Sequence, residues 1–165
     1  MTPTTSGRRD EREAGWVVLP RTFRMPRDEV WKAITEPERL ERWIGTWSGD
    51  PAEGRVSFRM TAEGEDIPAN DYVITGCRPT EHLGLEADAA GMHFELRLDL
   101  SEEDGVTTLL FAQRMSDPEV ASSVGPGWEY YLDRLVAAET GGDVADVKWD
   151  DYYPALADDY RALVS

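Results

Sequence analysis

Residues 92–100 have the sequence MHFELRLDL, and this segment decides the fold class. Apolar and polar side chains alternate strictly along it, which is typical of a β-strand with one buried face. Glu103-Asp104-Gly105 follows as a hairpin signal, and residues 106–115 form the predicted return strand. The core of the chain is therefore expected to be an antiparallel sheet with one apolar face.

Further strands are predicted on both sides of this hairpin from β-branched, aromatic and alternating residues. They cover residues 16–23, 54–60, 71–77 and 82–87. Two short helices are expected after the first strand, one opened by Pro26 and one started by Thr35, which has capping-box spacing to Glu38. A long amphipathic helix is expected to begin at Pro126, after a Gly125-Pro126-Gly127 turn, and a last helix to cover residues 151–163.

This order predicts an α+β fold of the helix-grip type. Strands joined in series by short turns pair antiparallel, because parallel pairs need long crossovers. A curved sheet of about six or seven strands must cover its apolar face, and the long C-terminal helix is the natural cover. Residues 1–15 are polar and without periodicity, so we expect a disordered tail there and a single domain over residues 16–165.

Residues 21–43, RTFRMPRDEVWKAITEPERLERW, resemble the opening of the Hsp90 ATPase activator homologue family. That family belongs to the START-like superfamily, also called SRPBCC or Bet v 1-like. The resemblance rests on an Arg and a Phe two residues apart, a Pro, a Val-Trp pair, an Ala-x-Thr-x-Pro-x-x-Leu run and a Trp. Gly127-Trp128 followed by Leu132 and Leu135 resembles the family's C-terminal helix. The resemblance covers residues 16–140 and leaves residues 141–165 as a helical extension.

The resemblance implies a helix-grip domain with a deep cavity between sheet and helix, which the superfamily uses for lipids, hormones and polyketides. Some members of the superfamily are cyclases. The activator that names the family contacts its chaperone through a separate N-terminal domain. This chain has only a short segment before Trp16, so the co-chaperone role is not carried over.

Aromatic and apolar side chains on the predicted inner faces are the candidate cavity wall, because small-molecule sites are mostly apolar with a few polar groups. The candidate ligand-binding residues are Arg21, Trp31, Trp43, Trp47, Phe58, Met60, Tyr72, Phe94, Leu96, Phe111, Trp128, Tyr131 and Leu132. Arg21 shares strand parity with Leu19 and Phe23, so its charge needs a partner. Either a structural ion pair or the anchoring of an acidic ligand would supply one.

Composition narrows the classes of function. The formal charge of −16 disfavours nucleic acids and anionic membranes as partners. The single cysteine, Cys77, suits a reducing compartment, and we expect a cytoplasmic protein. Cys77, His82 and His93 have no zinc-ligand spacing and no phosphate-binding glycine loop is present, so no metal and no cofactor are predicted.

Three hypotheses for the function follow. The first is binding of a small apolar or amphipathic molecule without transforming it. The second is an enzyme of the polyketide cyclase or aromatase type, which is disfavoured because alternation turns both histidines away from the core. The third is a protein-interaction module like the Hsp90 activator. The aromatic side of the last helix packs either on its own domain or on a second subunit, which leaves a homodimer open.

Overall fold

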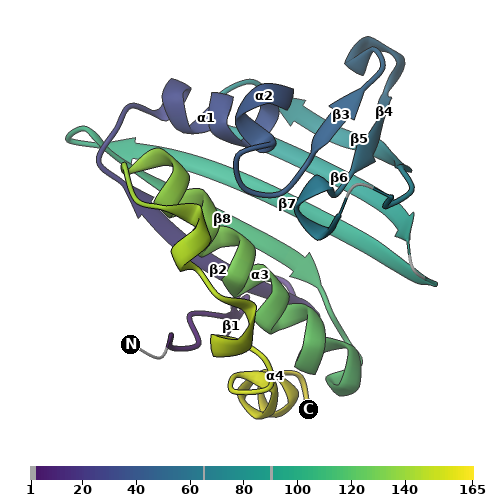
Figure 1. The fold of residues 1–165 in the computed structure, drawn as a ribbon. Coiled ribbons are helices and arrows are strands. Elements are labelled where there is room, and N and C mark those ends of the chain that lie inside the picture. The colour runs from purple at the N-terminus through teal and green to yellow at the C-terminus, as the bar shows by residue number, and fades with distance from the viewer. Residues whose placement is uncertain (1–2, 65, 90) are drawn as a thin grey trace.

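The computed structural model describes residues 3–64, 66–89 and 91–165, and it has the expected α+β helix-grip architecture (Figure 1). Eight antiparallel strands form one sheet in the order β1-β2-β8-β7-β6-β5-β4-β3. The strands are β1 (Arg8–Arg9), β2 (Trp16–Phe23), β3 (Thr46–Ser48), β4 (Arg55–Arg59), β5 (Asn70–Arg78), β6 (His82–Ala89), β7 (Met92–Glu103) and β8 (Val106–Arg114). The predicted alternation in β7 is confirmed, because Leu96, Leu98 and Leu100 are buried while His93 is exposed.

Helices cover one face and one end of this sheet. They are α1 (Arg27–Thr35), α2 (Pro37–Leu40), α3 (Pro118–Glu139) and α4 (Ala157–Val164). Figure 1 shows α3 lying across β2 and β8, with α1 and α2 beyond one end of it. Among the described residues, none of the helices combines the length and the hydropathy that a membrane-spanning segment needs. We call the sheet face toward α3 the inner face and the opposite one the outer face.

The long helix α3 begins eight residues earlier than predicted. Asp117 is its N-cap, with the side chain accepting a hydrogen bond from the Glu119 N–H, and Pro118 occupies the first turn. Pro126, expected to start the helix, lies buried inside it. The glycines on either side of Pro126 had suggested a turn, but the stronger start signal is the Asp-Pro-Glu sequence at residues 117–119.

The boundary between α1 and α2 also differs from the prediction. Thr35 ends α1, and its hydroxyl donates to the Trp31 carbonyl instead of capping α2. Two tryptophan indoles that follow α2 in the sequence donate hydrogen bonds to the C-terminal end of α1. Trp43 Nε1 donates to the Ala33 carbonyl at 3.0 Å, and Trp47 Nε1 donates to the Thr35 carbonyl at 2.7 Å. The carbonyls at the end of α1 thus receive side-chain donors.

The segment before Trp16 was expected to be disordered, and its described part is instead packed on the domain. Strand β1 pairs with the edge of β2. Arg97 of β7 forms ion pairs with Asp10 and Glu13 and lies over the Trp16 ring at 4.2 Å. Polar composition suggested disorder, but these charges have partners on the outer face of the sheet, which local sequence does not reveal.

A buried carboxylate joins both ends of the chain to α3. Glu129, on α3, is 1% exposed and accepts hydrogen bonds from the Ser6 hydroxyl, the Arg21 guanidinium and the Tyr160 hydroxyl. Burial, followed by the Glu129 charge, raises the pKa of Tyr160, which keeps its hydroxyl a donor. Helix α4 is thereby docked on α3, and an ion pair between Arg161 and Glu119 adds a second, exposed contact.

The Tyr160 ring fits against α3 only because residue 125 is a glycine. A Cβ placed there would lie 2.2 Å from Tyr160 Cγ, whereas a Cβ at Gly127, two residues along the same helix, would meet nothing within 4 Å. Alanine is favoured over glycine inside a helix by about 0.5–1 kcal/mol. A side chain at residue 125 would therefore clash with Tyr160, whereas a side chain at residue 127 of the same helix would not.

We predict that Gly125→Ala lowers the free energy of unfolding and undocks α4, because the ring of Tyr160 must move. The matched variant Gly127→Ala is expected to raise that free energy by up to about 1 kcal/mol. Urea unfolding measures both values. Equal effects of the two substitutions would contradict the close packing of Tyr160 on α3.

Candidate functional site

The two halves of the inner face differ in how well they are covered. Beneath α3, inward side chains such as Leu19, Leu109 and Phe111 are buried. On the other half, inward side chains are only half-buried although they pack against the core. We call six aromatic residues at this boundary the inner aromatic face: Trp47, Phe58, Tyr72, Phe94, Trp128 and Tyr131.

Strand register places four of these aromatics on the same face of β3, β4, β5 and β7. Trp47 of β3 lies opposite Phe58 of β4. Tyr72 of β5 lies opposite Ala87 of β6, which in turn lies opposite Phe94 of β7. The Phe58 and Tyr72 rings meet edge to face with centroids 5.2 Å apart, a favourable arrangement for aromatic pairs. The small Ala87 side chain separates Tyr72 from Phe94.

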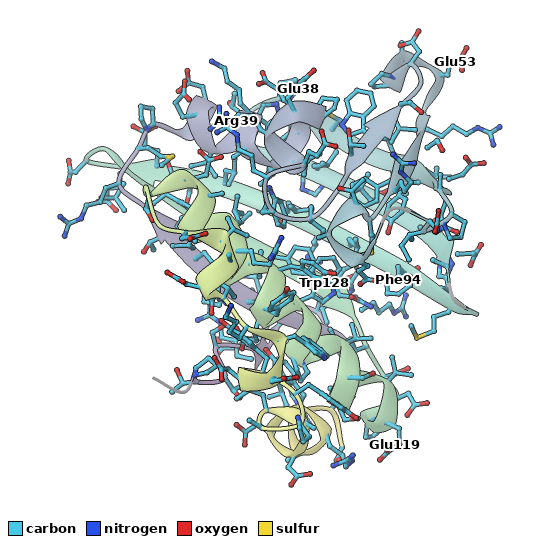
Figure 2. The ribbon with its side chains drawn as sticks, in the orientation of Figure 1. Glu38, Arg39, Glu53, Phe94, Glu119 and Trp128 are labelled. Carbon is cyan, nitrogen blue, oxygen red and sulfur yellow. The ribbon has the colours of Figure 1, made fainter. Side chains whose placement is uncertain are left out.

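Helix α3 contributes the other two rings. Trp128 lies against Phe111 with centroids 4.3 Å apart, and its indole N–H donates to the buried Gln113 side chain. The ring of Tyr131, on the same helix, has its centroid 6.2 Å from that of Trp128. Figure 2 shows Trp128 reaching from α3 toward the sheet, on the side where Phe94 lies. Gln113 thus accepts the hydrogen bond of the indole N–H where the half-buried Trp128 ring packs on the sheet.

The polar end of the inner aromatic face is formed by Glu63. Its carboxylate, in the 3-10 turn Thr61–Glu63, accepts a hydrogen bond of 2.7 Å from the Tyr131 hydroxyl. Burial and then Glu63 raise the pKa of Tyr131, and the same two causes raise the pKa of Tyr72. Both tyrosines are therefore neutral donors at physiological pH. The face thus offers an apolar wall with hydroxyl groups and one carboxylate at its end.

Arg21 lies on the inner face as parity predicted, but it is engaged by protein groups. Its guanidinium is 2.7 Å from Glu129 Oε1 and 3.1 Å from Asp133 Oδ1, and it also donates to the Ser6 hydroxyl. Of the two alternatives from the sequence, this geometry is that of the structural ion pair. Arg21 lies beneath α3, where its partners are Glu129, Asp133 and Ser6. It does not contribute to the polar end of the inner aromatic face at Glu63.

Other candidate residues fall into two groups. Trp43, Leu96, Phe111 and Leu132 are buried in the packed core. Trp31 and Met60 are half-buried at its edge. Glu63 and Gln113 were missed by the sequence argument, because their roles depend on contacts with α3. A buried polar residue on the apolar side of β8 was the only available signal for Gln113.

The expected enclosed cavity between sheet and helix is not confirmed. Two hollows formed by the described residues have volumes of about 460 and 350 Å³. Both are open and lie at the β5–β7 part of the sheet, lined in common by Asp88 and His93 on the outer face. Neither includes a residue of α3 or of the inner aromatic face.

Comparison with known proteins places the chain in a family. The model of the "Activator of Hsp90 ATPase homolog 1-like protein" family matches residues 24–139. The chain belongs to this family. No curated protein matches it at a significant level.

Solved structures extend the likeness beyond the matched segment. The crystal structure of CalU16 from Micromonospora echinospora is 26% identical with a TM-score of 0.68, and covers 96% of this chain and 94% of that one. The solution structure of CalU16 has a TM-score of 0.74 at 25% identity, with 96% and 91% covered. DynU16, described as a protein of the dynemicin biosynthetic locus, shares the fold at 20% identity and a TM-score of 0.60, covering 86% of this chain and 51% of DynU16.

The assignment of Arg21 to an ion pair predicts a large effect on stability. Arg21→Met keeps the apolar stem but leaves the buried Glu129 carboxylate without its cation, which costs about 3–5 kcal/mol of unfolding free energy. Arg55→Met is the matched control, since Arg55 forms an exposed pair with Asp71 at 3.8 Å, and such pairs contribute about 0–1 kcal/mol. Urea unfolding of both variants tests this difference, and a loss below about 1 kcal/mol for Arg21→Met would contradict it.

Proposed function

We propose that this chain binds a small amphipathic molecule on the inner aromatic face and does not transform it. The observation that carries the proposal is the contrast in burial: four aromatic side chains of the strands lie on the face toward α3 and are only half covered, and α3 adds two more rings. Aromatic side chains that remain partly exposed to solvent beside a packed core are typical of ligand-binding sites. Membership of a family with the helix-grip fold supports the same function.

The polar end favours a particular kind of ligand. Glu63 accepts hydrogen bonds and carries a negative charge, and Arg21 is occupied by Glu129 and Asp133. A ligand with an aromatic or apolar body and a hydrogen-bond donor, such as a phenol, therefore fits better than a carboxylate. This reverses the preference for acidic ligands that an Arg21 anchor would have given.

An enzyme is the second candidate, and one observation favours it. The Tyr131 hydroxyl and the Glu63 carboxylate, 2.7 Å apart, form a pair that can hold a proton beside the aromatic wall. The two histidines lie on the outer face, where His82 pairs with Asp99 and His93 with Asp88. Turnover of a bound ligand that is lost in Glu63→Gln would favour this second candidate.

The proposal also includes a cytoplasmic setting without a nucleic-acid partner. The charge of −16 gives no counterion release to drive association with a phosphate backbone. Native mass spectrometry of the freshly purified chain would detect a copurified molecule and reveal its chemical class.

We predict that the chain binds 1-naphthol and that Trp128→Ala weakens this binding about tenfold, the scale of a lost aromatic contact. Titration calorimetry measures the affinity, with 1-naphthoic acid as the acidic analogue that should bind more weakly. Trp149→Ala is the control, because Trp149 is exposed and its ring packs on Tyr130 and Tyr153, neither of which belongs to the inner aromatic face.

Thermal melts of each variant check that it is folded. Because Trp128 also packs on Phe111, Phe94→Ala from the sheet side is a second test of the same face. Unchanged 1-naphthol affinity in both variants, or a loss only in Trp149→Ala, would contradict binding on the inner aromatic face.

A further inference from the structure

Strands β6 and β7 bring four polar side chains together on the outer face of the sheet. Glu86 lies directly opposite Glu95, and Asp88 lies directly opposite His93. One ligand atom from each of Glu86, His93 and Glu95 lies within 4.8 Å of the other two. These atoms come from two paired strands rather than from loops, so the backbone holds their spacing.

The pairing of Glu86 with Glu95 places two like charges opposite each other, and Arg114 compensates this in part through its contact with Glu95. Like charges directly opposite each other destabilise a strand pair. Both carboxylates are half-buried, which limits the screening by solvent. A divalent ion between them would convert the repulsion into attraction, and an imidazole is already placed beside them.

Neighbouring groups orient two of the three ligands. Asp88 Oδ1 is 2.8 Å from His93 Nδ1, while His93 Nε2 faces Glu95 Oε1 at 3.8 Å. Arg114 holds the other oxygen of Glu95, with Nη1 3.2 Å from Oε2. A carboxylate on one imidazole nitrogen, with the other nitrogen facing the ligand set, is the arrangement found around metal-binding histidines.

Two of the three ligand residues, Glu86 and His93, border open space. The hollow of about 350 Å³ on this face is lined by Glu86, Asp88 and His93, together with Asp71 and Val73 of β5. An ion can reach Glu86 and His93 from this side, and coordination positions that the protein leaves free would face the hollow. Three protein ligands with an open position is typical of non-structural zinc sites.

We propose that Glu86, His93 and Glu95 bind one divalent ion of the zinc class, with Asp88 as a positioning residue. One imidazole and two carboxylates suit Zn²⁺ and Co²⁺, whereas Mg²⁺ and Ca²⁺ prefer oxygen ligands alone. The site lies on the opposite side of the sheet from the inner aromatic face. It is therefore independent of the proposed ligand-binding function.

The test uses the full chain without a histidine tag, titrated with Zn²⁺ by calorimetry and with Co²⁺ by visible absorption. One equivalent of Zn²⁺ is expected to bind, and His93→Ala and Glu86→Gln should each lower the affinity by more than about tenfold. Asp88→Asn should lower it about 10- to 100-fold while the stoichiometry stays at one.

Two controls isolate this cluster. His82 also pairs with an aspartate, with Nδ1 2.7 Å from Asp99 Oδ1, but it is not part of the three-ligand group. His82→Ala and Cys77→Ser, which removes the exposed thiol, should both bind Zn²⁺ as the unaltered chain does. Melts without metal check the fold of every variant.

Three results would overturn the proposal. The first is a Zn²⁺ affinity unchanged in both His93→Ala and Glu86→Gln, which would mean diffuse binding to the acidic surface. The second is equal affinity for Zn²⁺, Mg²⁺ and Ca²⁺. The third is a dissociation constant for Zn²⁺ above about 1 mM in the unaltered chain.

Discussion

The buried Glu129 carboxylate is the constraint on which the arrangement of this molecule depends. A carboxylate that is 1% exposed must receive hydrogen bonds or a cation, since an unpaired charge in the interior is costly. Its partners come from three separate places: the segment before β1, strand β2 and helix α4. One side chain of α3 thus joins both ends of the chain to the sheet, and a second ion pair, from Arg39 to Glu139, holds the C-terminal end of α3.

With α3 held on the inner face by Glu129, the two faces of the sheet carry different side chains, aromatic ones toward α3 and charged ones on the outer face. Trp128 and Tyr131 flank Glu129 in sequence and meet the sheet from the helix, so the aromatic wall and its Glu63 end follow from the same anchoring. The outer face of β6 and β7 carries charged side chains in register, which places Glu86, His93 and Glu95 together. The amphipathic ligand is proposed for the first face and the divalent ion for the second, and neither proposal depends on the other.

Sequence patterns predicted the elements better than the contacts between them. Alternation in residues 92–100 fixed which side of β7 is buried, and the parity of Arg21 correctly directed it toward α3. Its partners, Glu129 and Asp133, lie more than 100 residues away and were not predictable. The same holds for the ordered segment before Trp16, for Glu63, and for the Glu86–Glu95 pair, which exists only in the register of β6 with β7. The early start of α3 was the one error that local capping signals could have prevented.

Hydrogen exchange of Glu129→Gln compared with the unaltered chain tests the role of this carboxylate most directly. The amide of the substituted residue turns a donor toward donors, so the account predicts faster exchange in residues 3–9, in α4 and around Trp128 and Tyr131 at the same time. Exchange in the hairpin of β6 and β7 should stay unchanged, because it makes no contact with Glu129. Faster exchange in only one of the three regions, or in none, would contradict the claim that one buried carboxylate holds them together.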